Sequence, residues 1–194
     1  MDPAPRHIVL AAALSFVLAV ILELLLFRIG YVPANCPSLG SASPLAIVEE
    51  AARALFLYQY VLRASNSLRE RVLFGAVFGW LEFCVKAFAF ADHTLCLAAT
   101  EPMPCVDGLP YLAVAASEAI LFQIFITAVN YRDATSPSRL VICTAVGAVL
   151  HAALNATKFL RIEESDNAFV YLTMPTLLIL VYAAVASISL RPSS

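Results

Sequence analysis

The fold is decided by residues 7–27, which read HIVLAAALSFVLAVILELLLF. Glu23 is the one acidic residue in this apolar run. An α-helix needs about 20 apolar residues to cross the hydrocarbon core of a bilayer. The run is longer than the apolar region of a secretory signal, which has about 7–15 residues, and no A-x-A cleavage site follows it. We therefore expect a membrane-anchoring helix here.

The composition extends this expectation to the whole chain. Apolar residues make up 61% and charged residues 13% of the 194 residues, and the mean hydropathy is +0.84. Soluble domains have about 45–50% apolar and about 25% charged residues. We therefore expect an all-α integral membrane protein. A formal net charge of −2, with scattered basic residues, argues against nucleic acid as a partner.

The remaining apolar runs complete a bundle of about six transmembrane helices. The expected spans cover about residues 7–27, 44–63, 72–91, 109–131, 139–160 and 169–190. No repeat, low-complexity tract or linker divides the sequence. We expect one polytopic membrane domain, 1–194, with a motif-bearing core at about residues 44–161.

The distribution of basic residues predicts the orientation, because Lys and Arg concentrate in cytoplasmic loops. They lie before the first span, in the second and fourth connections and after the sixth span: Arg6, Arg63, Arg69, Arg71, Arg132, Arg139 and Arg191. The third connection, residues 92–108, has none. Both termini are therefore expected in the cytoplasm. Cys96 and Cys105 share the third connection, either as a disulfide or as two reduced thiols.

Three motifs place strongly polar residues inside the apolar runs. They are Glu49-Glu50-x-x-Arg53, Phe78-x-x-x-Glu82 and His151-x-x-x-Asn155. Polar groups in the hydrocarbon layer are costly, so each must face a partner or a water pocket. At about 1.5 Å of rise per residue, all three motifs fall in the expected outer half of the membrane. We expect one pocket there, open to the outside.

Neighbouring polar residues are expected to support these motifs. Residues three or four apart share a helix face, so Arg53 can reach Glu49 or Glu50, and Lys86 can reach Glu82. Glu118 lies at a similar depth on the fourth span. Purely structural ion pairs or interhelical hydrogen bonds remain an alternative for each motif.

The order and spacing of the motifs resemble a superfamily of glutamate-dependent intramembrane proteases. It contains the PrsW-type proteases, the type II CAAX prenyl endopeptidases and related bacteriocin-processing and immunity proteins. The first two spacings are PrsW-like, with Arg53 in place of Lys, and His151-x-x-x-Asn155 is CAAX-like. The resemblance covers about residues 49–155. It implies a multi-pass protein of a bacterial or archaeal cell membrane that cleaves a membrane-anchored peptide or protein.

The resemblance also implies roles for the motif residues. Glu49 or Glu50 would be the general base that activates water, and Arg53 would orient this pair. His151 and Glu82 would hold the water, and Asn155 would donate to the oxyanion. No cofactor is favoured, although Glu50, Glu82 and His151 could together hold a divalent metal such as zinc.

Two other classes of function remain open. A non-catalytic scaffold or immunity-type member of the superfamily would use the same residues to lock the helices together. A small proton-coupled transporter would use Glu23, Glu82, Lys86 and Glu118 as a path. Apart from Gln123 and Asn130, however, the expected inner half is dry. The oligomeric state is open.

Overall fold

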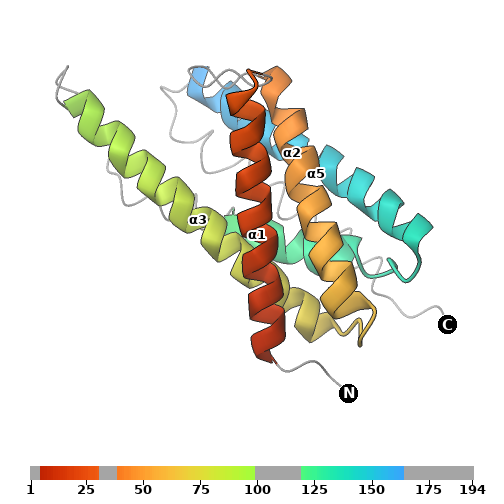
Figure 1. The fold of residues 1–194 in the computed structure, drawn as a ribbon. Coiled ribbons are helices and arrows are strands. Elements are labelled where there is room, and N and C mark those ends of the chain that lie inside the picture. The colour runs from red at the N-terminus through yellow and green to blue at the C-terminus, as the bar shows by residue number, and fades with distance from the viewer. Residues whose placement is uncertain (1–4, 31–38, 99–118, 164–194) are drawn as a thin grey trace.

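The computed structural model describes residues 5–30, 39–98 and 119–163, and these residues are helical apart from short connections (Figure 1). Helix α1 spans Pro5–Arg28 and α2 spans Leu39–Leu57, extended by a π-helical turn η1 at Tyr58–Leu62. Helix α3 spans Leu68–Ala98. A segment Ala119–Asn130 ends in the π-helical turn η2, Ile126–Asn130. Helix α5 spans Pro137–Glu163.

The all-helical prediction is confirmed for the described residues, which contain no strand. Two described helical stretches are long and apolar enough to cross a membrane, Pro5–Arg28 and Pro137–Leu154. The second, third and fifth expected spans fall inside α2 with η1, α3 and α5. The described part of the fourth begins at residue 119, and the sixth lies outside the described residues.

One boundary was wrong. Helix α3 continues to Ala98, so residues 92–98 of the expected third connection are helical. The stretch is short of helix breakers: Pro102 and Pro104 come only after it. Cys96 therefore lies on α3, while Cys105 lies outside the described residues, as does any disulfide between them.

Helix α1 is built with small residues inward and large apolar residues outward. Its buried side chains are mostly small: Ile8, Ala11, Ala12, Ser15 and Ala19. Its exposed side chains include Leu10, Val17, Ile21 and Leu24. Small residues let helix backbones approach closely, as in membrane helix pairs. An apolar face of this size is unfavourable in contact with water, but it can contact lipid chains.

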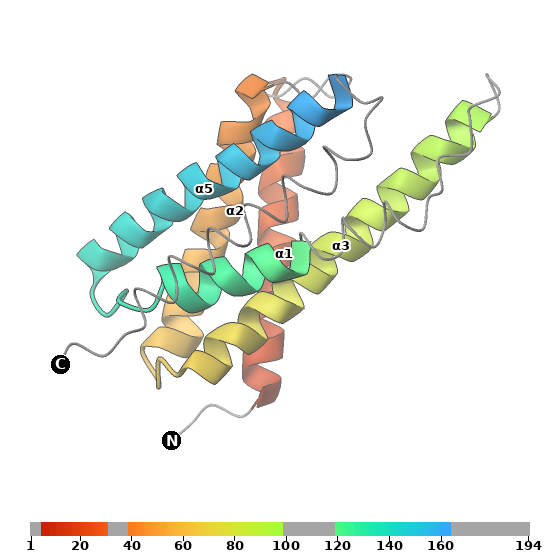
Figure 2. The ribbon, with the colours of Figure 1, turned by 180° about the vertical axis from the view of Figure 1, so that it is seen from behind.

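The helices are arranged side by side with α2 near the middle. Helix α2 packs against α1 on one side and α5 on the other, and α1 also packs against α3. Figure 2 shows the segment Ala119–Asn130 crossing the opposite face of this layer, where it packs against α3 and α5. The fully buried large side chains of the core include Leu57, Phe74, Phe78, Ile126 and Tyr131.

Two glycines allow α3 to approach the crossing segment. A Cβ added to Gly75 would lie 2.6 Å from the carbonyl oxygen of Gln123, and one added to Gly79 would lie 2.7 Å from the Cα of Ile120. Both obstacles are backbone, which cannot swing away. Gly75 and Gly79 are four residues apart and therefore share one face of α3. This face sets how closely Glu82, one turn further along, approaches the crossing segment.

The connection after η1 is held by a second set of polar contacts. Asn66 adopts a left-handed conformation, with φ of 51°, and its side-chain amide donates to the carbonyl oxygen of Arg132 at 3.0 Å. The guanidinium of Arg71 donates to the carbonyl oxygens of Asn66, at 2.6 Å, and Ala128, at 3.0 Å. These contacts join the second and fourth connections, which are both rich in arginine.

Candidate functional site

The site begins on α2, where Glu49 and Glu50 are adjacent. Adjacent residues on an α-helix point about 100° apart, so the two carboxylates meet different neighbours. Glu50 is completely buried, while the Glu49 side chain retains 14% of its exposure. The two carboxylates therefore differ in burial and in the groups they contact.

Glu50 is surrounded by donors. Arg53, one turn along α2, donates to its Oε1. The Tyr131 hydroxyl donates to its Oε2 at 3.1 Å, and Nδ1 of His151 lies 3.2 Å from Oε1. A Cβ added to Gly147 would lie 2.7 Å from Oε2, so a larger residue at this position of α5 would displace the carboxylate. Glu50 therefore serves as a buried acceptor at the junction of α2 and α5.

Arg53 connects two sides of the site. Its guanidinium is fully buried and donates to Glu50 through Nη1 and to Oε1 of Gln123 through Nη2. The same group lies over the ring of Phe78, with Cζ 4.6 Å from the ring centroid. A desolvated cation gains roughly 2 kcal/mol from such a ring. The aromatic residue of the second motif thus supports the arginine of the first.

Gln123 carries the network to α3. Its side chain is fully buried, and its Nε2 donates to Oε2 of Glu82. Contacts therefore run from Glu50 through Arg53 and Gln123 to Glu82. Three separate pieces of the chain are joined by buried polar groups that partner one another, as buried charge requires.

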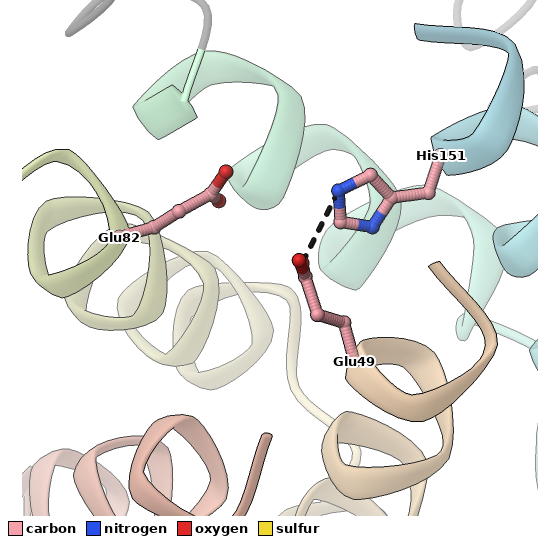
Figure 3. Close-up of side chains that lie close together, drawn as sticks. All are labelled: Glu49, Glu82 and His151. Atoms are coloured by element: carbon pink, nitrogen blue, oxygen red, sulfur yellow. Dashed lines mark ion pairs between the residues drawn. The ribbon is translucent and has the colours of Figure 1, made fainter. Parts of the chain in front are cut away.

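Glu49, Glu82 and His151 converge from three helices (Figure 3). One ligand-type atom from each lies within 4.8 Å of the others. Oε2 of Glu49 lies 3.2 Å from Nε2 of His151. This oxygen is buried and makes no aligned hydrogen bond within the described residues. Its contact with His151 meets the distance for an ion pair but not the geometry of a hydrogen bond. The cluster of these three residues is called the Glu–Glu–His cluster below.

Further groups border the Glu–Glu–His cluster. Glu23 of α1 lies close enough to Glu49 for their carboxyl groups to interact. The ring of Phe122 meets the His151 imidazole edge-on, with centroids 5.2 Å apart. His151 is thus held between Glu49 and Glu50 through its two nitrogens and by an aromatic ring on the crossing segment.

The structure brings together five residues of the predicted site: Glu49, Glu50, Arg53, Glu82 and His151. Asn155 lies one turn beyond His151 on α5, and Lys86 one turn beyond Glu82 on α3, but their side chains are outside the described residues, as is all of Glu118.

The grouping of possible metal ligands differs from the predicted one. Glu50 was named as a possible ligand with Glu82 and His151, whereas Glu49 takes that place. Glu50 is turned instead toward Arg53 and Tyr131. Spacing along one helix cannot decide which of two adjacent glutamates faces a particular neighbouring helix.

Two residues of the network were not predicted as site residues. Gln123 was assigned to an otherwise dry inner half, yet it contacts Glu82 directly. Tyr131 lies at the end of the crossing segment and contacts Glu50. A polar glutamine in an apolar run was a usable signal for the first. Nothing in the sequence distinguishes Tyr131 from other aromatic residues.

The Glu–Glu–His cluster brings a carboxylate oxygen of Glu49 and an imidazole nitrogen of His151 close to the carboxylate of Glu82, in a largely buried setting. Such a set can position a water molecule, move a proton or bind a small cation. Comparison with known protein families, curated proteins and solved structures finds no match. The site is therefore interpreted from its own chemistry.

Proposed function

We propose that this chain is a multi-pass integral membrane endopeptidase, which hydrolyses a peptide bond of a membrane-anchored substrate with activated water. The single observation that carries the proposal is the convergence of Glu49, Glu82 and His151 from three helices. Ionisable groups within membrane helices are costly and mark reactive or transport sites. Their sequence order also resembles the PrsW-type and CAAX-type proteases.

The membrane location is supported by the distribution of exposed side chains. Large apolar residues remain exposed along α1, among them Leu14 and Leu25, and along α5, among them Val141 and Val149. The polar network lies between these helices. We propose the six-span topology, with both termini in the cytoplasm and the Glu–Glu–His cluster nearer the outer side.

Glu49 is the proposed general base. Glu50 accepts from Arg53 and Tyr131 and lies beside Nδ1 of His151, so three polar groups already contact its carboxylate. Glu49 faces the Glu–Glu–His cluster with an oxygen that lacks an aligned hydrogen bond among the described residues. In the proposed reaction, Glu49 takes a proton from water while His151 and Glu82 hold that water. The resulting hydroxide attacks the scissile carbonyl carbon.

The later steps use the same groups. Asn155 donates its side-chain amide to the developing oxyanion, an interaction that contributes about 2.7–4 kcal/mol in other proteases. The protonated base then delivers its proton to the leaving amine as the C–N bond breaks. A divalent ion, when bound, would be held by Glu49, Glu82 and His151 and would act as a Lewis acid. We favour the metal-free reaction, because one imidazole among carboxylates is a poor zinc set.

The test uses the full chain reconstituted in vesicles with a panel of single-span, membrane-anchored peptides. Cleavage is followed by mass spectrometry in water enriched in ¹⁸O. We expect one ¹⁸O atom in the new carboxyl terminus. Glu49→Gln should lower turnover by about 10²–10⁴-fold, the usual contribution of a general base.

Asp133→Asn is the matched control, because this exposed acid lies outside the network. It should cleave like the unaltered chain. Full activity of Glu49→Gln would overturn the proposed role of this residue. Absence of cleavage for every anchored peptide by the unaltered chain would overturn the protease proposal.

A non-catalytic scaffold is the second candidate, and a specific observation favours it. Glu50, Arg53 and Gln123 are completely buried and join α2 to the crossing segment. A network of this kind also serves to hold helices in one arrangement. For a scaffold, Glu49→Gln should change the thermal stability or partner binding, and no turnover should be found.

A further inference from the structure

Gln123 occupies a particular place in the network. It lies on the crossing segment and bridges Arg53 of α2 and Glu82 of α3. It is fully buried, and the Cβ that Gly79 lacks would lie 3.1 Å from the Cβ of Gln123. The backbone of α3 therefore passes directly against this side chain.

The chemistry of the two partners determines which way the amide points. A guanidinium has only donors, so the carbonyl oxygen of Gln123 must face Arg53. The amino group is then directed to Glu82, whose oxygen must accept. Reversing the amide would set donor against donor at Arg53. The charge of Arg53 thus selects the orientation of a group that touches Glu82.

We infer that Gln123 is a positioning residue, which holds the Glu82 carboxylate toward Glu49 and His151. Its carbonyl oxygen accepts from Arg53, and this contact directs its amino group to Glu82. The inference rests on the proposed hydrolysis and concerns the same site. Gln123 does not belong to the Glu–Glu–His cluster and acts through Glu82. Its amide offers both a donor and an acceptor, which no apolar residue of similar length can do.

The first experiment measures turnover of Gln123→Met, which keeps the length of the side chain and removes both hydrogen bonds. We expect kcat to fall by about 10–100-fold, as for other residues that orient a reactive group, with KM within about twofold. Gln59→Met is the matched control. Gln59 also accepts from an arginine, Arg63, but on an exposed surface, and its replacement should leave both constants unchanged.

The second experiment does not depend on activity. Gln123→Glu places a carboxylate against Glu82, and adding Glu82→Gln restores a donor to face it. We expect Gln123→Glu to lower Tm and the double variant to recover about 2–4 °C of the loss. In the unaltered background, Glu82→Gln should give no such gain, because the amino group of Gln123 already has Glu82 as its acceptor before the substitution.

The outcomes separate the two proposals. A reduced kcat for Gln123→Met, together with the recovery in Tm, supports the positioning role. A kcat within about twofold of the unaltered chain, or equal effects of Glu82→Gln in both backgrounds, overturns it. If the unaltered chain cleaves nothing, the proposed function fails, and the Tm comparison alone decides whether Gln123 directs Glu82. If Gln123→Met does not fold, the same Tm comparison decides the question.

Discussion

At the residue scale, neighbouring glutamates have different partners. Glu50 is completely buried among donors, and Glu49 is turned toward Glu82 and His151. Arg53 is the reason, because its position one turn along α2 fits Glu50. Once Glu50 is drawn to Arg53, the helical offset of about 100° directs Glu49 away from the guanidinium, toward Nε2 of His151. One residue is thereby suited to structure and the other to chemistry.

This division predicts that replacing each glutamate by glutamine lowers the free energy of unfolding by a different amount. Glu50→Gln leaves Arg53 as a buried charge without its carboxylate partner, so the free energy of unfolding should fall by about 3–5 kcal/mol. Glu49→Gln should change it by less than about 1 kcal/mol. Thermal and denaturant unfolding in detergent micelles measure both. A larger loss of stability for Glu49→Gln than for Glu50→Gln would contradict the assignment.

The metal-free reaction makes a second prediction at this scale. If water is activated by Glu49 alone, turnover in vesicles should be unchanged after incubation with a strong chelator and dialysis. A catalytic ion would instead be removed and its return should restore activity. Loss of turnover on chelation, with recovery on adding zinc, would show that the Glu–Glu–His cluster holds a metal.

At the element scale, close helix packing brings the polar residues together. Gly75 and Gly79 let α3 lie against the crossing segment, and Ala11, Ala12 and Ala19 line the inner side of α1. In lipid there is no hydrophobic driving force between helices, so helices associate through the close packing of such small-residue faces. The distance between α3 and the crossing segment therefore determines whether Gln123 reaches Glu82.

Gly75→Ala should expose this dependence. The added Cβ would meet the carbonyl oxygen of Gln123 at 2.6 Å, and overpacking of this kind costs about 1–3 kcal/mol. Because the helices must separate, kcat should fall as well. Unfolding and turnover are measured on the same preparation.

Gly30→Ala provides the steric comparison, since nothing lies within 4 Å of its added Cβ. Its positive φ of 70° adds a local strain, so some loss of stability is expected, but kcat should be retained. Unchanged turnover in Gly75→Ala would show that the spacing of α3 does not control the site.

At the scale of the whole molecule, the described helices carry large apolar side chains on their outer faces and enclose a polar network as well as an apolar core. Exposed leucines, isoleucines and valines cover the outer faces of α1 and α5, while glutamates, Arg53, Gln123 and His151 lie within. This is the arrangement expected of a helical bundle in lipid, where backbone and polar groups must be satisfied internally. This arrangement supports the proposed membrane location.

Cysteine labelling tests the topology. In a cysteine-free background, Arg69→Cys and Ser138→Cys should react with a membrane-impermeant maleimide only when the cytoplasmic face is accessible. Val146→Cys, on the exposed apolar face of α5, should resist this reagent from both sides. Labelling of Val146→Cys in intact vesicles, or of Arg69→Cys from the outside, would contradict the proposed arrangement.

The sequence alone was sufficient for the helical class and for most of the residues that meet at the site. Apolar runs determine helices locally, and spacings of three or four residues determine which side chains share a face, as for Glu50 and Arg53. Tertiary structure decided the rest: that both glutamates reach His151 but it is Glu49 that forms the cluster with Glu82, and that Gln123 and Tyr131 belong to the network. The reason is that these contacts depend on the rotation and separation of helices far apart in the chain. Glycines such as Gly79 and Gly147 set that separation through contacts that no local spacing reveals.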